Sequence, residues 1–302
     1  MWGLGVERNP SAGESWLRKA ALAGDADAAA LVGDLYAKGG LLPPNYAEAA
    51  IWFRRAADGG HQGAARALGL LYLTGAGVGR DLVEAARWLR IPAAAGDSRA
   101  RVDLANLTLR GVVESSSEDR LEARRWLEQA ARSGDAVAAF NYGLCLAEGT
   151  GVERDDRQAA QWLRRAAAEV PSAQYWFGRM LVDGRGVDAD APAGRAWIAR
   201  AAAVGIADAE AALAEMMVNG RGGPRDPAGA ASLFESAAAK GHVGAMFALG
   251  ALKSGGYGVT ASHAMSLHWL RMAAERGHGE AQAMLGRSLM SEPKHAWQCV
   301  GR

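Results

Sequence analysis

Apolar and polar positions along this 302-residue chain repeat with a period near 36 residues, and within each period they follow the spacing of an α-helix. Each period holds two stripes. In the first, an apolar residue precedes a glycine or alanine, and a second apolar residue usually follows two positions later, as in Leu68, Gly69 and Leu71. In the second, a small residue stands three positions before an aromatic one, as in Ala85 and Trp88. The pattern predicts two helices per period, named here helix A and helix B, with small residues that let helices approach closely.

The aromatic position of helix B sets the period. Its spacing is 35 to 38 residues, and tryptophan occupies seven of its eight occurrences. The residues at this position are Trp16, Trp52, Trp88, Trp126, Trp162, Trp197, Leu233 and Trp269. We expect these large side chains to fill the core beside the small residues of neighbouring helices, with Trp162 more than four-fifths buried.

Helix boundaries are marked as regularly. Asn, Asp or Ser stands seven residues before each aromatic position, where its side chain accepts hydrogen bonds from free N–H groups at a helix start. The predicted N-caps of helix B are Asn9, Asn45, Asp81, Asp119, Asp155, Asp190, Asp226 and Ser262. Eight residues after the aromatic position a glycine ends helix B in seven periods, and Val170-Pro171 replaces it once. Helix A follows and ends in a glycine-rich turn.

These motifs resemble the Sel-1-like repeat, a relative of the tetratricopeptide repeat. The stretches from Leu68 to Trp88 and from Tyr142 to Ala167 carry the pattern almost whole, and the resemblance covers roughly residues 3 to 290. It implies an all-α fold, a right-handed α/α superhelical solenoid of helix–turn–helix repeats. The family implies protein–protein adaptors and names no common ligand.

The repeat predicts one solenoid over residues 1–302, with a partial repeat at 1–24, about seven full repeats at 25–277 and a truncated repeat at 278–302. The chain opens in the turn before a helix B, so either an upstream part precedes it or this helix packs without its partner. Pro92 inside helix B and a longer turn at residues 114–119 suggest a local bend or loosening near residues 90–120. Simple drift in a tolerant repeat is the alternative.

Net charge and composition limit the classes of partner that this chain can be expected to bind. The chain has 34 Lys plus Arg and 33 Asp plus Glu, which argues against nucleic acid or an anionic membrane as the main partner. No apolar run approaches the roughly 20 residues of a membrane span. The N-terminus does not resemble a signal peptide, so the default expectation is the cytoplasm. A signal segment upstream of Met1 would instead indicate the periplasm or secretion.

Residues suited to chemistry are few. The glycine turns lack the Gly-Lys-Ser/Thr sequence of a phosphate-binding loop. His61, His242 and His278 follow helix-ending glycines and are interpreted as helix caps, so no metal site is predicted. Cys145 lies on the apolar stripe of helix A, Cys299 lies in an irregular tail, and no histidine is placed to activate either thiol. We expect no cofactor and no enzymatic activity.

By analogy with tetratricopeptide repeats, positions three before, one after and five after the helix A glycine should face the concave side of the solenoid. The predicted partner-binding residues there are Phe140, Leu144, Glu148, Tyr175, Trp176, Arg179 and Asp183. Aromatic and charged side chains together are typical of a peptide-binding groove. The leading hypothesis is a non-catalytic scaffold that binds a protein or peptide along this face. One alternative is a structural subunit, homo- or hetero-oligomeric, docked through its open N-terminal end, and another is an enzyme or ligand-binding protein of unknown class.

Overall fold

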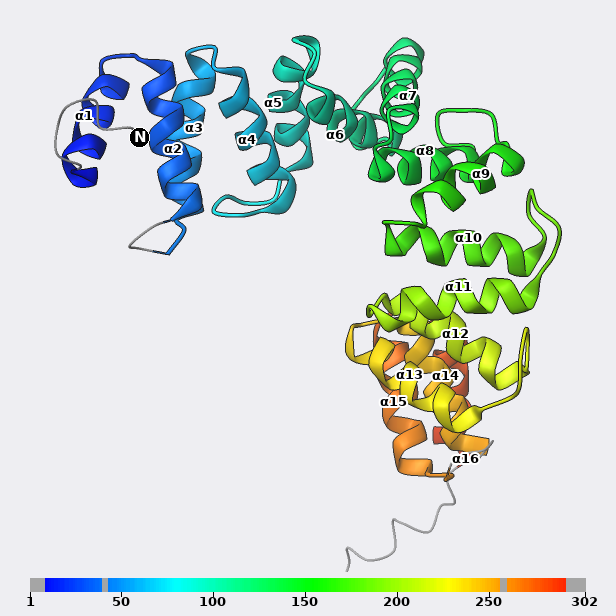
Figure 1. Ribbon diagram of the computed structural model, residues 1–302. Coiled ribbons are helices and arrows are strands. Elements are labelled where there is room, and N and C mark those ends of the chain that lie inside the picture. The colour runs from blue at the N-terminus through cyan, green and yellow to red at the C-terminus, as the bar shows by residue number, and fades with distance from the viewer. Residues whose placement is uncertain (1–8, 40–42, 256–259, 292–302) are drawn as a thin grey trace, which may run out of the picture. The chain divides into compact units, whose positions relative to one another are not determined.

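The computed structural model describes residues 9–39, 43–255 and 260–291, and every regular element in these ranges is an α-helix (Figure 1). The chain divides into two units, Met1–Arg154 and Asp155–Arg302, which are described separately below. Within each unit every helix packs against the next one along the chain. The alternation of helices B and A predicted by the sequence is therefore the plan of both units.

The first unit begins with a helix B and ends with a helix A. Its helices are α1 (Pro10–Leu22), α2 (Ala26–Lys38), α3 (Tyr46–Asp58), α4 (Gln62–Thr74), α5 (Leu82–Ala94), α6 (Ser98–Leu109), α7 (Ser117–Arg132) and α8 (Ala136–Glu148). The odd-numbered helices are helices B and the even-numbered ones helices A. In this unit α2 also contacts α4, and α6 contacts α8, so successive helices A form a layer of their own.

The second unit repeats the same alternation. Its helices are α9 (Asp156–Ala166), α10 (Pro171–Asp183), α11 (Ala191–Ala203), α12 (Ala207–Asn219), α13 (Pro227–Ala239), α14 (Val243–Gly255), α15 (His263–Glu275) and α16 (Gly279–Ser291). Its buried residues are mainly alanine, leucine, methionine and phenylalanine contributed by both kinds of helix.

Seven of the eight predicted N-caps of helix B are confirmed, and Asp119 is wrong. The cap of α7 is Ser116, whose hydroxyl accepts from the Asp119 N–H at 3.1 Å, while the Asp119 carboxylate accepts from the Ser116 N–H at 2.8 Å. This reciprocal capping box satisfies two backbone donors, so the extra residues of the longer turn join the helix.

The cap role of the histidines is confirmed at the starts of helices A. The Nδ1 atom of His61 accepts from the Ala64 N–H at 2.9 Å, and the Nδ1 atom of His242 accepts from the Ala245 N–H at 3.0 Å. The glycines that end helices B take left-handed φ values, for example +103° at Gly24. Each helix B therefore stops where the sequence predicts, and helix A begins at once.

Glycine on helix A forms a notch for helix B of the same repeat. A Cβ atom placed on Gly69 would lie 2.8 Å from Leu89 Cγ, and one on Gly178 would lie 2.7 Å from Ile198 Cγ1. Both distances are far inside van der Waals contact, so only a residue without a side chain lets the helices come this close. The residue that enters the notch stands 20 positions later, directly after the aromatic position of helix B.

That following residue, rather than the tryptophan, is the centre of the core. From Phe53 to Leu270 it is between 0% and 5% exposed in every described repeat. Of the tryptophans in the described parts of the chain only Trp88 is buried, at 6% exposure; Trp162 is partly buried, and Trp16 is 68% exposed. The expectation that every tryptophan fills the core is wrong at Trp16. Elsewhere the residue in the notch takes the centre of the core, and partly buried indoles such as those of Trp52 and Trp269 pack beside it.

At the rim, a cation covers the indole. The Arg165 guanidinium lies 5.0 Å from the Trp162 ring centroid, and the Arg200 guanidinium lies 4.5 Å from that of Trp197. Both arginines stand three residues after their tryptophan, one turn along the same helix. The contact is a cation–π interaction.

Pro92 does not interrupt its helix. Helix α5 runs unbroken from Leu82 to Ala94, and the Pro92 ring is fully buried. In the next helix, Leu104 and Leu107 are each 6% exposed. The proline is therefore accommodated inside a continuous, buried helix, and the bend or loosening expected near residues 90–120 stays a prediction.

Candidate partner-binding surface

The predicted partner-binding residues lie on two helices A, one in each unit. In the first unit, Phe140, Leu144 and Glu148 stand one turn apart on α8. Phe140 and Leu144 are partly buried and Glu148 is exposed. Spacing of four residues puts the three side chains on one face of the helix. This face of α8 therefore carries two apolar side chains, followed by the carboxylate of Glu148 at the C-terminal end of the helix.

In the second unit, Tyr175, Arg179 and Asp183 form a connected stripe along α10. The Arg179 Nη1 atom donates to the Tyr175 hydroxyl at 3.0 Å, and its guanidinium lies 5.9 Å from the tyrosine ring centroid. On the other side, Arg179 Nη2 lies 3.8 Å from an Asp183 carboxylate oxygen. The predicted residues of this helix are therefore brought together, and each restricts the rotamers of the next.

Trp176 extends the stripe sideways. Its ring meets that of Tyr175 edge to face, with the centroids 5.9 Å apart, and both side chains are partly buried. Phe177, the next residue, is only 5% exposed and packs edge to face against Trp197. The three consecutive aromatic residues thus divide between the surface and the core.

One functional candidate was missed by the sequence reasoning. Arg221, in the turn after α12, lies 3.1 Å from the Asp183 carboxylate and donates to the Val182 carbonyl at 2.8 Å. It covers acceptors at the C-terminus of α10 that the helix itself leaves free. The sequence does carry a signal for it. Arg185 occupies the equivalent position in the turn of the preceding repeat, 36 residues earlier.

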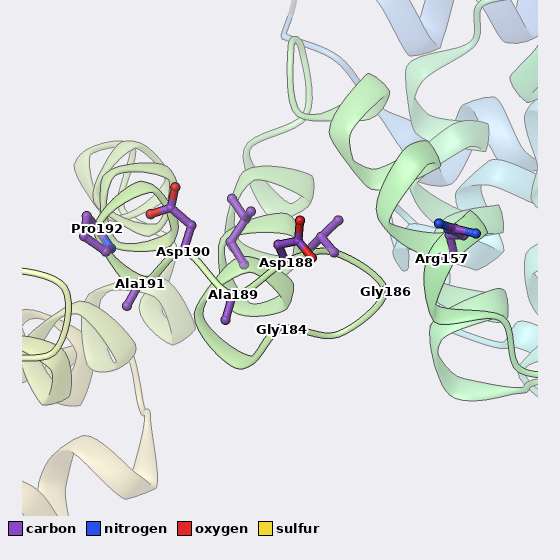
Figure 2. Close-up of a pocket in the computed structure, with 10 residues that line it drawn as sticks. Arg157, Gly184, Gly186, Asp188, Ala189, Asp190, Ala191 and Pro192 are labelled. Atoms are coloured by element: carbon purple, nitrogen blue, oxygen red, sulfur yellow. The ribbon is translucent and has the colours of Figure 1, made fainter.

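Two surface pockets, called hollows below, are candidates for a ligand or catalytic site. The larger, about 920 Å³, is formed by the turn between α10 and α11 together with Arg157. Figure 2 shows this turn, with Arg157 on one side and Pro192 on the other. Asp188 and Asp190 on it are exposed, so the hollow is open to solvent and does not enclose a ligand.

The smaller hollow lies in the first unit and measures about 370 Å³, with Asp27, Asp34 and His61 among its lining residues. The His61 Nδ1 atom is already occupied as a cap, and its Nε2 atom lies 3.8 Å from the exposed Asp27 carboxylate. No nucleophile stands beside this histidine in the lining. Across residues 9–39, 43–255 and 260–291, no three His, Cys, Asp or Glu residues gather as metal ligands would.

Cys145 is partly buried on α8, and burial raises the pKa of its thiol to about 11. At neutral pH the group is therefore protonated and a poor nucleophile. Cys299 and His295 lie outside the described residues. Within the described parts of the chain, none of the helices combines the length and the apolar character that crossing a membrane requires.

Helix pairs repeated at a fixed period, with an exposed patterned face and open hollows, define the class of helical-repeat interaction scaffolds. The Sel1 repeat family model matches residues 1–25, 26–61, 63–97, 98–135, 136–169, 171–205, 207–242 and 243–278. The chain therefore belongs to the Sel1 repeat family, whose repeats generally serve as non-catalytic scaffolds for protein–protein interaction.

Solved structures agree with this assignment. A Sel1 repeat protein from Oxalobacter formigenes is 31% identical, with a TM-score of 0.70 over 94% of this chain and 83% of its own. The Escherichia coli protein c5321, a protective antigen of uropathogenic strains, is 28% identical, with a TM-score of 0.71 over 95% of this chain. This chain spans 60% of the length of c5321. A comparison with curated proteins gave no match.

Proposed function

We propose that this protein is a non-catalytic scaffold that binds a partner protein or peptide on the surface formed by its helices A. The observation that carries the proposal is the stripe of Tyr175, Arg179 and Asp183 on α10, flanked by Trp176. Tyrosine, tryptophan and arginine dominate binding hot spots, because they bury a large area for few rotatable bonds. On α8 of the first unit, Phe140, Leu144 and Glu148 offer a second surface of the same kind.

The contacts along α10 support this role. Arg179 is held between Tyr175 and Asp183, so less side-chain freedom is lost when a partner binds than at an unrestrained surface. Two guanidinium groups, those of Arg179 and Arg221, share the single carboxylate of Asp183. This arrangement favours a partner segment that brings an acidic group beside an apolar side chain.

Peptide selection followed by mutagenesis tests the proposal. A random peptide library would be selected against the unmodified chain, and the strongest selected peptide titrated by calorimetry. Tyr175→Ala combined with Arg179→Ala should weaken binding at least about thirtyfold, equal to about 2 kcal/mol. The helical circular dichroism should be kept; Tyr175 packs partly against the core, so the melting temperature should fall, and binding is measured well below it.

The matched control places the same two changes on helices B. Tyr46 on α3 is 42% exposed and Arg87 on α5 is exposed, so Tyr46→Ala combined with Arg87→Ala removes the same groups elsewhere. It should leave the affinity unchanged. Equal affinity of the α10 double variant and the unmodified chain would show that this stripe is not the binding site.

A second candidate function is that of a structural subunit docked through its N-terminal end. The observation that favours it is the exposure of Trp16 on α1. This side chain is 68% exposed, although Trp88 at the equivalent position of α5 is 6% exposed. Large exposed apolar groups of this kind mark interaction surfaces.

A further inference from the structure

Among the described residues, none enters the notch on α16. Gly286 occupies the position that Gly178 holds on α10 and Gly250 holds on α14. A Cβ atom on Gly250 would lie 2.7 Å from Leu270 Cγ, whereas one on Gly286 would meet no atom within 4 Å. Leu285, directly before this glycine, is partly buried, while the equivalent Phe177 is 5% exposed. Within the described part of the chain, α16 thus presents the face of a helix A on which no following helix B packs.

Helix α1 presents the complementary face. Leu17 occupies the position of the residues that enter notches in other repeats, yet it is only partly buried, whereas the equivalent Ile198 is 0% exposed. Trp16 occupies the position of Trp197, which packs on Phe177 with ring centroids 5.7 Å apart. Among the described residues, no helix A packs on the face of α1 that meets a preceding helix A in other repeats.

A third pair of positions matches in the same register. In the α10/α11 pair, Gly194 on helix B lies so close to helix A that a Cβ atom there would be 2.5 Å from Val182 Cγ2. The position of Gly194 is held on α1 by Gly13, and the position of Val182 is held on α16 by Met290. Val182 is 6% exposed, whereas Met290 is 89% exposed.

We propose that α1 of one copy of this chain packs on α16 of a second copy, so that the two helices complete one more A–B pair. Leu17 would enter the notch at Gly286, Trp16 would pack on Leu285, and Gly13 would receive Met290. The α10/α11 pair is the template for each of these contacts. The inference rests on the second candidate function above, and it identifies the partner as the protein itself.

A second copy fits better than an unrelated partner because one chain carries both halves of the pair. Three positions on α1 and three on α16 match those of a pair already packed inside the chain, so the new contact continues an existing interface. Such an interface is heterologous, with different surfaces on the two copies. A single pair of 13-residue helices buries less than a standard interface, below about 1,200 Å², so the association should be weak and depend on concentration.

Sedimentation velocity of the full chain, over a wide range of protein concentration, tests the proposal. The unmodified chain should form larger species as the concentration rises. Trp16→Glu blocks the α1 face, and Gly286→Leu fills the notch of α16. Each variant should weaken association at least about thirtyfold. Both should remain folded, because Trp16 is mostly exposed and the space around Gly286 is open.

Mixing the two variants is the decisive measurement. Trp16→Glu keeps a free α16 face and Gly286→Leu keeps a free α1 face, so the mixture should form a one-to-one dimer and nothing larger. Ile51→Glu on α3 is the control, since Ile51 is 61% exposed on a helix that forms neither face, and it should associate like the unmodified chain.

The results of these measurements distinguish a second copy of the chain from any other segment that could cover α1 or α16. An unmodified chain that stays monomeric throughout, or a mixture that does not form the dimer, would overturn the proposal; a terminal segment of the same chain folded onto α1 or α16 would give this result. Larger species that form equally in both variants would also overturn it. Peptide binding at α10 is measured on the same variants and should be unaffected, so failure of this inference is distinguishable from failure of the scaffold function.

Discussion

The notch on helix A makes a quantitative prediction at Gly178. In Gly178→Ala the new methyl group would lie 2.7 Å from Ile198 Cγ1 and 2.8 Å from the Gly194 carbonyl oxygen. One neighbour is a fully buried side chain and the other is backbone, so α10 and α11 must move apart. Overpacking of this kind costs about 2–3 kcal/mol, while alanine recovers about 1 kcal/mol of helix propensity. We therefore expect a net loss of about 1–2 kcal/mol.

The same substitution at the equivalent position of α16 is the control. Gly286→Ala gains the same helix propensity and meets no neighbour within 4 Å, so it should stabilise the protein by up to about 1 kcal/mol. The two variants differ by one methyl group at one position of the repeat. Their opposite signs would isolate the effect of packing from that of propensity.

Urea unfolding followed by circular dichroism gives the overall stabilities, at a protein concentration too low for association. Because helical repeats can unfold in parts, hydrogen exchange of the amides in α10 and α11 reports the local effect. If Gly178→Ala and Gly286→Ala shift stability in the same direction, the close approach at Gly178 does not govern the packing of this pair. The description of glycine as a notch would then be refuted.

Three further outcomes are expected. In a Cys299→Ser background at pH 8, alkylation of Cys145 should be about a hundredfold slower than in the urea-unfolded chain, because burial raises the pKa of the Cys145 thiol from 9.0 to about 11. Lys240→Met should destabilise the protein by roughly 1–3 kcal/mol in urea unfolding, because the buried Glu210 carboxylate loses its cation at 2.6 Å, and adding Glu210→Ala should restore most of the loss. NMR titration should find the pKa of Asp155 below the ordinary value of an aspartate, because its carboxylate accepts hydrogen bonds from the backbone and side chain of Gln158. Its stabilisation of α9 is present above the ordinary pKa and is lost as the pH falls through the lowered one.

Much of the candidate surface on α10 followed from spacing alone. Tyr175, Arg179 and Asp183 are four residues apart, which places them on one face of any helix. The contribution of Arg221 could not be predicted this way, because it lies 38 residues after Asp183 and meets it only through the packing of two successive repeats. Spacing within one helix is a local property, whereas a contact between repeats depends on where the turns place their side chains.

The sequence by itself determined the period, the order of helices and nearly all of their ends. These features depend on residues within one or two turns of each other: a capping side chain, a left-handed glycine or a small residue at helical phase. Asp119 was misplaced because Ser116, three residues earlier, offered a competing local cap that the repeat alignment passed over.

Only the tertiary structure decided which apolar residue of helix B is the core. Trp162 and Leu163 are adjacent and both apolar, so periodicity could not rank them. The leucine is 0% exposed, as are Leu89 and Ile198 at the same position of other repeats, where each enters a glycine notch. The wide indole remains at the rim under Arg165. Burial depends on the shape of the neighbouring helix, and that shape exists only once the two helices have packed.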